Sequence, residues 1–315
     1  MIDAASPPAA PHLLVPAAAA ARDGRPPLAA LFGADFSALS ITPSRADGAP
    51  GVVRAALPRF APWDADSGVD LAAWCVPDLG DAGAVRMAWA EAFEAITTLA
   101  GRALDACPFT IGLGGDHSVT WPIATAAAAR CTRLGIVQLD VHHDVRSPEH
   151  GPSNGTPIRG LIEAGAVRAA DVVQLGIHPW GNRRELTAWC EKHGVRRMGL
   201  EEVSALGPMA AAGEALALLP ECDAIWLTVD IDVLDRAFAP GTVAALPGGL
   251  TPAVLAALVR EICADPRVRG LDVVEFDPTR DVSSITAYNA AHVVMQGLAA
   301  AAERAVTPPS QTSSP

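Results

Sequence analysis

The chain has 315 residues, of which 50% are apolar and 18% are charged, and its formal net charge at pH 7 is −12. That composition supplies enough apolar side chains for one large core or two small ones. The acidic balance, without any cluster of lysine and arginine, lacks the usual electrostatic signature of a nucleic-acid partner. The sequence contains no run of about 18 apolar residues, which a membrane span would need. It also contains no basic segment followed by an apolar one, which a secretory signal would need. We therefore expect a cytoplasmic protein whose partners include neither nucleic acid nor a membrane.

The predicted elements alternate between short apolar strands and longer helices. Strands are predicted at residues 28–32, 109–113, 134–139, 172–177, 224–229 and 270–274. Helices are predicted at about 84–106, 118–131, 183–193, 208–219, 252–264 and 285–304. This alternation in one continuous stretch predicts an α/β fold with a mainly parallel central sheet.

A single domain is predicted over residues 27–305, because neither a repeat nor a linker interrupts the alternation. Residues 1–26 and 306–315 are rich in Ala, Pro and small polar residues, so both are predicted to be disordered tails. The six cysteines are far apart and form no CxxC pair. This spacing favours buried thiols in a reducing compartment over a thiolate zinc site or a disulfide scaffold.

Polar residues follow several of these strands, at the end where open parallel sheets form their sites. After the strand at 109–113 comes the sequence GGDHS, whose glycines allow a sharp turn and a close approach to a ligand. Asp116 and His117 then lie at the end of this strand. A turn in which Ser118 caps the next helix is the alternative explanation.

The stretch LDVHHDVR, residues 139–146, directly follows the next apolar run. Asp140, His142 and Asp144 alternate, so on extended backbone they project from one side, while His143 points the other way. Three side chains able to bind a metal at this spacing predict a ligand set. A hydrogen-bonded Asp–His pair with a structural role is the alternative.

Two further strands also end in carboxylates. Asp230 and Asp232 alternate after the strand at 224–229, and adjacent carboxylates repel each other and raise each other's pKa unless a cation compensates. No Arg or Lys lies within this cluster, which favours a metal ion. Asp235, beside Arg236, is expected to form an ion pair or to cap a turn. Glu275 closes the last strand, where a loop-capping carboxylate is the alternative.

Pooled, these residues give four carboxylates and two imidazoles without a thiolate. The predicted metal ligands are His117, Asp140, His142, Asp144, Asp230 and Asp232. This set suits Mn²⁺ or a similar first-row divalent ion, and it suits calcium or structural zinc poorly. With two bridging carboxylates, six ligands would serve two ions about 3.5–4 Å apart.

Taken together, GGDHS, the D-x-H-x-D triplet and the D-x-D-x-x-D segment followed by APGT resemble the arginase/agmatinase (ureohydrolase) superfamily over roughly residues 28–304. The resemblance implies a three-layer α/β/α fold and a binuclear manganese site. It also implies hydrolysis of a C–N bond in an amidine or guanidine substrate, in a homo-oligomer that is a trimer or a hexamer. A nickel-dependent relative is left open, because this ligand set is not strictly selective.

The resemblance also assigns roles to individual residues. One ion would be bound by His117, Asp140, Asp144 and Asp230. The other would be bound by Asp140, His142, Asp230 and Asp232. Glu275 takes the position of a catalytic glutamate that pairs with the cationic amidine or guanidinium group. A hydroxide between the ions would attack the planar carbon that this pairing orients.

One departure concerns proton transfer. Arginases and agmatinases carry a histidine that shuttles a proton, and Asn154 stands in its place in SNGTPIRG. We expect Asn154 to contact the substrate. An amide cannot relay a proton, so we expect His143 or His150 to supply it, or the leaving amine to take a proton from metal-bound water.

Within the superfamily, HHDVR and NGTPIRGLIE are most similar to formimidoylglutamases, which split N-formimidoyl-L-glutamate into glutamate and formamide. Arg146 is predicted at the pocket rim, where its planar guanidinium would hold a substrate carboxylate; an ion pair with Glu149 is the alternative. Arg159 is expected to brace the loop. His178, after another strand, is predicted to contact the substrate, or else to be a packed, hydrogen-bonded residue.

Three hypotheses remain at this point. The chain is a formimidoylglutamase, or it hydrolyses agmatine, a guanidino acid or another guanidine compound, or it is a non-catalytic subunit that keeps the fold and partners an active chain.

Overall fold

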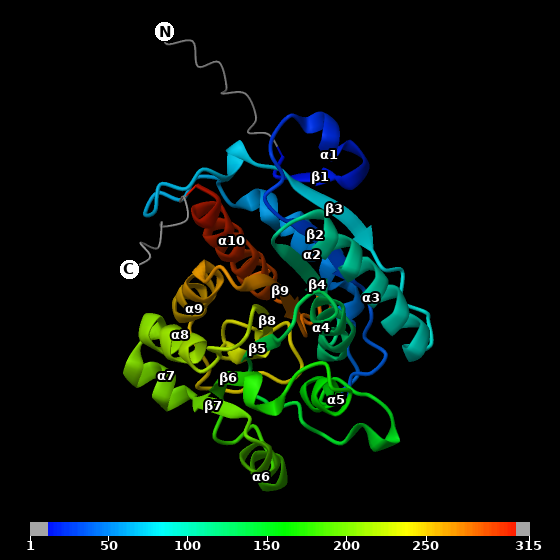
Figure 1. The fold of residues 1–315 in the computed structure, drawn as a ribbon, viewed down its shortest axis with the longest axis vertical. Helices are drawn as coiled ribbons and strands as arrows, with labels where there is room; N and C mark the ends of the chain where they lie inside the picture. Colours follow the sequence, from blue (N-terminus) through cyan, green and yellow to red (C-terminus); the bar gives the residue numbers. More distant parts are fainter. Residues whose placement is uncertain (1–11, 307–315) are drawn as a thin grey trace.

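The computed structural model describes residues 12–306, and a nine-stranded sheet runs through them (Figure 1). Every pairing between its neighbouring strands is parallel. In spatial order the strands are β1 (Leu14–Pro16), β3 (Val76–Asp81), β2 (Ala30–Ala34), β4 (Thr110–Gly114), β9 (Val268–Val274), β8 (Ala224–Asp230), β5 (Leu134–Leu139), β6 (Val172–Ile177) and β7 (Arg196–Gly199).

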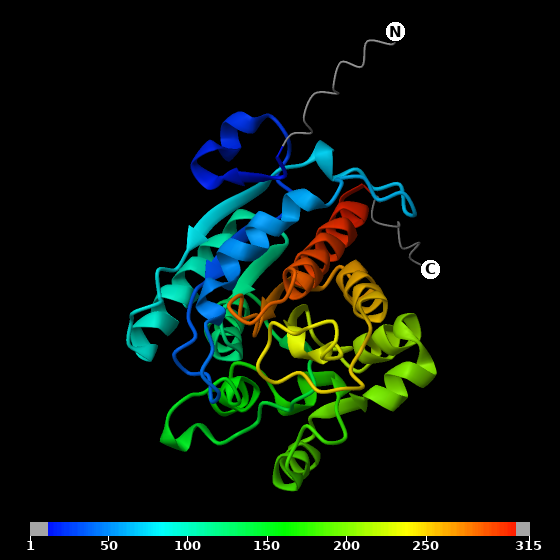
Figure 2. The same ribbon diagram turned by 180° about the vertical axis from the view of Figure 1, so that it is seen from behind.

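Helices cover both faces of the sheet, as Figures 1 and 2 show from opposite sides. One apolar core lies under α2 (Ala49–Ala56), α7 (Leu200–Leu206), α8 (Pro208–Ala217), α9 (Pro252–Ala264) and α10 (Ile285–Val306). The other lies under α3 (Trp89–Ala106), α4 (Thr120–Ala128), α5 (Pro157–Glu163) and α6 (Arg184–His193). The predicted three-layer α/β/α fold is confirmed. Among residues 12–306, no helix has the length and apolar character needed to cross a bilayer.

The N-terminal segment differs from the prediction. Residues 14–23 form β1 and α1 (Ala17–Asp23), so the prediction of disorder over residues 1–26 is wrong for this stretch. Backbone pairing supplies the order, because Val76 donates its N–H to the carbonyl of Leu13 at 2.9 Å and β1 extends the sheet beyond β3. Residues 1–11 and 307–315 of the two expected tails lie outside the described residues.

The centre of the sheet places the site. β4 and β5 follow each other in the sequence, but β9 and β8 lie between them in the sheet. Such a change of strand order leaves a crevice at the carboxyl ends of the strands. The polar residues predicted after β4, β5, β8 and β9 therefore come from four adjacent strands.

Candidate active site

The six predicted metal ligands converge at this edge of the sheet. His117 Nδ1 lies 3.1 Å from Asp140 Oδ2, 2.7 Å from Asp144 Oδ2 and 3.2 Å from Asp230 Oδ2. His142 Nδ1 lies 3.0 Å from Asp232 Oδ2 and 3.4 Å from Asp140 Oδ1. Two groups able to hold a metal ion result: one is His117, Asp140, Asp144 and Asp230, and the other is Asp140, His142 and Asp232. Asp140 belongs to both.

The turn after β4 places His117. A Cβ on Gly115 would overlap the carbonyl oxygen of Phe36, so only glycine allows the two segments to approach this closely. Asp116 donates its N–H to that carbonyl at 2.9 Å. The side chain of Asp116 caps the following turn by accepting from the N–H of Ser118 at 3.0 Å. The alternative explanation, in which Ser118 is the cap, is therefore wrong, because the carboxylate of Asp116, two residues earlier, takes that place.

The ligands after β5 are placed by a turn rather than by an extended strand. β5 ends at Leu139, and Asp144 has a left-handed backbone with φ of 53°. Glu275, after β9, is also left-handed, with φ of 65°. Each such conformation costs about 1–3 kcal/mol in a residue with a Cβ, so the surrounding contacts must hold both carboxylates in place.

The cluster carries more negative charge than its imidazoles can neutralise. Burial raises the pKa of Asp230 well above its usual range, and the carboxylates of Asp232 and Asp140 raise it further. Burial, followed by the charge of Asp140, raises the pKa of Asp144 to about 6. Burial alone would lower the pKa of His142, but Asp232 and Asp140 outweigh it and raise the value to about 12. Four buried acids facing two imidazoles call for a further cation.

The hydrogen bonds of His117 identify its ligand atom. Nε2 lies 3.0 Å from Thr228 Oγ1, and the Thr228 hydroxyl donates to Asp272 Oδ1 at 2.7 Å. Because that hydroxyl has one proton, Nε2 must be the donor to Thr228. Nδ1 is then the ring nitrogen left for a metal ion: it is buried without a hydrogen-bond partner and faces three carboxylates. Against the effect of burial, these carboxylates raise the pKa of the imidazole well above its usual value. A metal ion among these atoms would relieve the repulsion between the carboxylates.

A cavity of about 160 Å³ lies against the cluster. Its lining includes Glu275, Arg146 and Asn154. Glu275 Oε1 accepts from the N–H of His117 at 2.7 Å and from Asn154 Nδ2 at 2.9 Å, whereas Oε2 is buried without a partner. Burial raises the pKa of Glu275 to about 8, and the charge of Asp116 adds to the shift. The free oxygen is suited to an N–H donor that enters the cavity.

Arg146 is exposed and lines the cavity. Its backbone N–H donates to the carbonyl of Gly155 at 2.9 Å, and a Cβ on Gly155 would lie 2.7 Å from Arg146 Cδ. Glycine at 155 therefore leaves room for the arginine side chain. Within residues 12–306, the ion pairs do not include one between Arg146 and Glu149.

Comparison with known proteins identifies the family to which this chain belongs. The family model described as the Arginase family matches residues 28–299. The chain belongs to the arginase family. Formimidoylglutamase from Halalkalibacterium halodurans is 38% identical over 277 residues, which are 85% of each chain. Agmatinase from Bacillus subtilis is 34% identical over 193 residues, which are 60% of this chain and 63% of that protein. The crystal structure of formimidoylglutamase from Bacillus subtilis matches with a TM-score of 0.84 at 32% identity, covering 91% of this chain and 90% of that one.

Three histidines given site roles from the sequence lie outside the cavity of this arginase-family chain. The ring of His143 is buried on the other side of the β5 loop, with Nδ1 2.7 Å from Gln174 Oε1 and Nε2 3.1 Å from Thr187 Oγ1. His150 is exposed at the end of a short 3₁₀ turn. His178 is hydrogen-bonded to the carbonyl of Pro247. These positions speak against proton transfer by His143 or His150 and against substrate contact by His178 in this cavity.

Asp235 accepts the N–H groups of Ala237 and Gly248 and so caps its loop, one of the two roles expected of it. Arg159 was expected to brace the loop, but its side chain pairs with Glu163 at 2.6 Å within α5.

Some residues that support the site were not found from the sequence. Asn154 was predicted to bind the substrate in the place of a histidine, but its two contacts were not predicted: it donates to Glu275 and accepts from the N–H of Ile41 at 3.0 Å. Asp272, behind His117, was not singled out either. A carboxylate inside an otherwise apolar strand was the signal for Asp272, because a buried charge requires partners.

Proposed function

We propose that this arginase-family chain is a formimidoylglutamase, a hydrolase that converts N-formimidoyl-L-glutamate and water into L-glutamate and formamide. The observation that carries the proposal is the composition of one cavity. Its wall contains the acid–histidine cluster, a buried glutamate with a free oxygen, and an arginine at the rim. An amidine that bears carboxylates has a group complementary to each of the three.

Two Mn²⁺ ions are the cofactors that fit the cluster. We assign His117, Asp140, Asp144 and Asp230 to one ion, and Asp140, His142, Asp230 and Asp232 to the other. Four carboxylates balance the charge of two divalent ions, and the unpartnered Nδ1 of His117 provides a ready nitrogen ligand. When bound, the ions supply Lewis acidity and a nucleophile at neutral pH.

Glu275 would hold the reacting end of the substrate. The formimidoyl group is a planar cation when protonated, and its N–H groups match the unpartnered Oε2 atom. Because Oε1 is held by His117 and Asn154, the carboxylate has one orientation and presents one oxygen to the cavity. This fixes the amidine carbon against the metal cluster.

Arg146 would hold a carboxylate at the other end of the substrate. Its guanidinium can bind a carboxylate through two parallel hydrogen bonds. Agmatine ends in a cation and would be repelled by the same group. A guanidino acid is the second candidate substrate, because it offers the same cation to Glu275 and the same anion to Arg146.

A product assay tests the proposal. The purified protein, loaded with Mn²⁺ and in parallel with Ni²⁺, is incubated with formimidoylglutamate, a guanidino acid, agmatine and arginine. Formamide and glutamate from the first compound, without urea from the others, support the proposal. Urea release from a guanidino acid at a higher kcat/KM would select the second candidate, and no product from any compound would overturn both.

A further inference from the structure

Two glutamines lie inside the sheet, where the fold itself has no need of polar groups. Gln138 on β5 and Gln174 on β6 are Cα partners in the parallel register, and both side chains are fully buried. The flanking pairs in the same register are apolar, Val137 with Val173 and Leu139 with Leu175. A buried amide is unfavourable unless its hydrogen bonds are satisfied, so this pair calls for a reason.

The hydrogen bonds of the two glutamines form one directed chain that ends on Asp140. Gln138 Nε2 donates to Asp140 Oδ2 at 2.6 Å. Gln174 Nε2 donates to Gln138 Oε1 at 2.7 Å and to the carbonyl of His143 at 2.8 Å. His143 Nδ1 lies 2.7 Å from Gln174 Oε1, and its Nε2 lies 3.1 Å from Thr187 Oγ1.

Each amide in this chain has only one workable orientation. A carboxylate accepts only, so Gln138 must direct its NH₂ group to Asp140 and its carbonyl to Gln174. Gln174 must then donate to that carbonyl, which leaves its own carbonyl to accept from the Nδ1–H of His143. Thr187 completes the chain as the donor to His143 Nε2. A rotation of either amide would place two like atoms together.

The hydrogen-bond series ends on Asp140, the carboxylate that belongs to both groups of metal ligands. Asp140 Oδ1 accepts from the N–H of His142 at 2.6 Å, and Oδ2 accepts from Gln138. Oδ2 faces His117 in one group, and Oδ1 faces His142 in the other. A rotation of this carboxylate would therefore disturb both groups, and Gln138 is the side chain that opposes it.

We propose that Gln138, held by Gln174 and His143, is a positioning residue that fixes the Asp140 carboxylate for both metal ions. The inference rests on the metal binding of the proposed function. It gives His143 a different role from the one expected from the sequence: the ring anchors a buried amide chain instead of relaying a proton. Hydrogen-bond partners of metal ligands typically change metal affinity about 10- to 100-fold when removed.

The test compares metal affinity with stability in three variants. Gln138→Met removes the donor to Asp140 and leaves Gln174 Nε2 with only the carbonyl of His143 as an acceptor. The double variant Gln138→Met/Gln174→Met removes both amides and moves the loss of hydrogen bonds to His143, whose Nδ1 then lacks its partner. Val173→Ala, on the apolar face of β6, weakens the packing of the same sheet and leaves the hydrogen bonds between His143, Gln174 and Gln138 in place. Mn²⁺ affinity is measured by chelator competition, ions per chain by mass spectrometry, and the melting temperature on the metal-free protein.

We expect Mn²⁺ to bind the single and the double Gln138 variant about 10- to 100-fold more weakly than the wild-type protein, because both lack the donor to Asp140. Val173→Ala should lower the melting temperature and leave the affinity within about twofold. The inference is overturned if the Gln138 variants keep wild-type affinity, or if affinity follows melting temperature across all three variants. A wild-type chain that binds no Mn²⁺ or Ni²⁺ would instead reject the proposed function.

Discussion

Asn154 donates a hydrogen bond to Glu275 across 121 residues of sequence, with Nδ2 2.9 Å from Oε1. Its own Oδ1 accepts from the N–H of Ile41 at 3.0 Å. One amide thus links the buried glutamate of the cavity to a second segment of its lining, because Ile41 also lines the cavity. At the position where the resemblance to arginases and agmatinases predicts a proton-relaying histidine, this protein has an amide that holds a carboxylate.

We expect Asn154→Ala to lower kcat/KM for formimidoylglutamate roughly 10- to 100-fold, because a hydrogen bond to a charged group contributes about 1.5–3 kcal/mol. Metal content should be unchanged, since Asn154 contacts none of the six metal ligands through its side chain. Steady-state kinetics and metal analysis on the same preparation check both statements. Loss of the ions together with activity would show that Asn154 supports the cluster and not Glu275.

Arg146→Met should selectively weaken the binding of acidic substrates. We expect kcat/KM for formimidoylglutamate to fall roughly 10- to 100-fold through a higher KM, because about 1.5–3 kcal/mol of charge-assisted hydrogen bonding is lost. A formamidine of similar size that lacks carboxylate groups should be hydrolysed as by the wild-type protein. Arg159→Met is the matched control, since that arginine pairs with Glu163 on α5. Equal losses on both substrates would contradict the role given to Arg146.

Variants of the metal ligands should differ in how many ions each variant protein retains. Asp140→Ala is expected to lose both ions, because this carboxylate belongs to both groups. Asp144→Ala and Asp232→Ala should each selectively weaken the binding of one ion, since each residue belongs to a single ligand group. Asp235→Ala should keep both, because Asp235 only caps its loop. Metal analysis after gel filtration distinguishes these outcomes, and two ions retained by Asp140→Ala would disprove the shared assignment.

The convergence of the ligands could be predicted from the sequence because parallel strands end at one edge. Asp140 and Asp230 each follow an apolar run, so any parallel arrangement with β5 beside β8 brings them together. The strands toward the two ends of the sheet were harder to find. β3, next to the edge strand β1, contains Pro77 and Gly80, and the edge strand β7 begins with two arginines, so neither resembles an apolar strand. Backbone pairing rather than composition defines such strands.

The roles of individual polar side chains could not be predicted in the same way. His143 was expected to point away from the ligands, and it does, but the sequence could not reveal what lies on that side. Its partner Gln174 is brought there by the register between β5 and β6. Asn154 and Glu275 likewise meet through two loops whose conformations depend on the whole fold. Hydrogen bonds of this kind follow from tertiary geometry, which local pattern does not encode.

Gly115→Ala should destabilise the protein strongly, because the added Cβ would overlap the backbone of Phe36 and no flexible side chain could move aside. We expect a loss of about 2–4 kcal/mol, the range in which overpacked sites lie. Gly213→Ala is the matched control, since Gly213 lies inside α8 with open space around it. Alanine there should stabilise by about 0.5–1 kcal/mol. Chemical denaturation of the metal-free chain measures both, and equal effects would contradict the packing of this turn.

The buried cysteines should make the protein less stable at alkaline pH. Burial raises the pKa of Cys190 and Cys263 to about 12, and that of Cys107 and Cys222 to about 11. An unfolded thiol has an ordinary pKa of about 8.5. Above that pH the unfolded chain loses protons that the folded chain retains, so each thiol lowers stability by up to about 1.4 kcal/mol per pH unit. Below about pH 8 the thiols are protonated in both states and contribute nothing to the pH dependence of stability.

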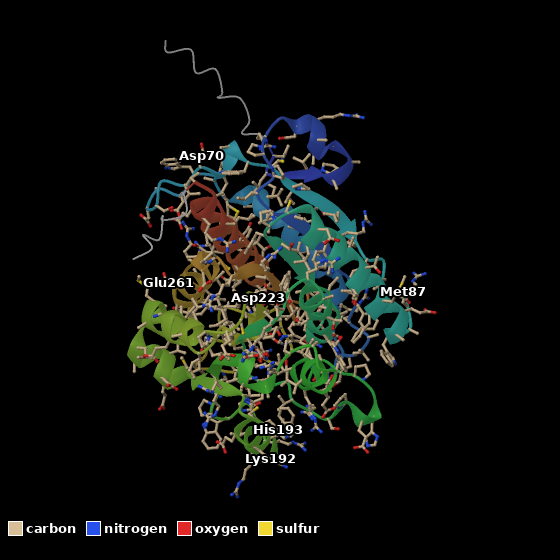
Figure 3. The ribbon with its side chains drawn as sticks, viewed as in Figure 1. Asp70, Met87, Lys192, His193, Asp223 and Glu261 are labelled. Atoms are coloured by element: carbon tan, nitrogen blue, oxygen red, sulfur yellow. The ribbon has the colours of Figure 1, made fainter. Side chains whose placement is uncertain are left out.

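A comparison with a cysteine variant separates the thiol from other groups that titrate in this range, such as His142, whose pKa is raised to about 12. Lys192 is the single lysine and Tyr288 the single tyrosine of the sequence. Lys192 is exposed near the end of α6, as Figure 3 shows. We expect the free energy of unfolding to fall steeply between about pH 9 and 11, with a smaller slope in Cys263→Ala than in the wild-type chain. Urea denaturation at half-unit pH steps measures both slopes, and identical slopes would mean that this thiol does not retain its proton in the folded state.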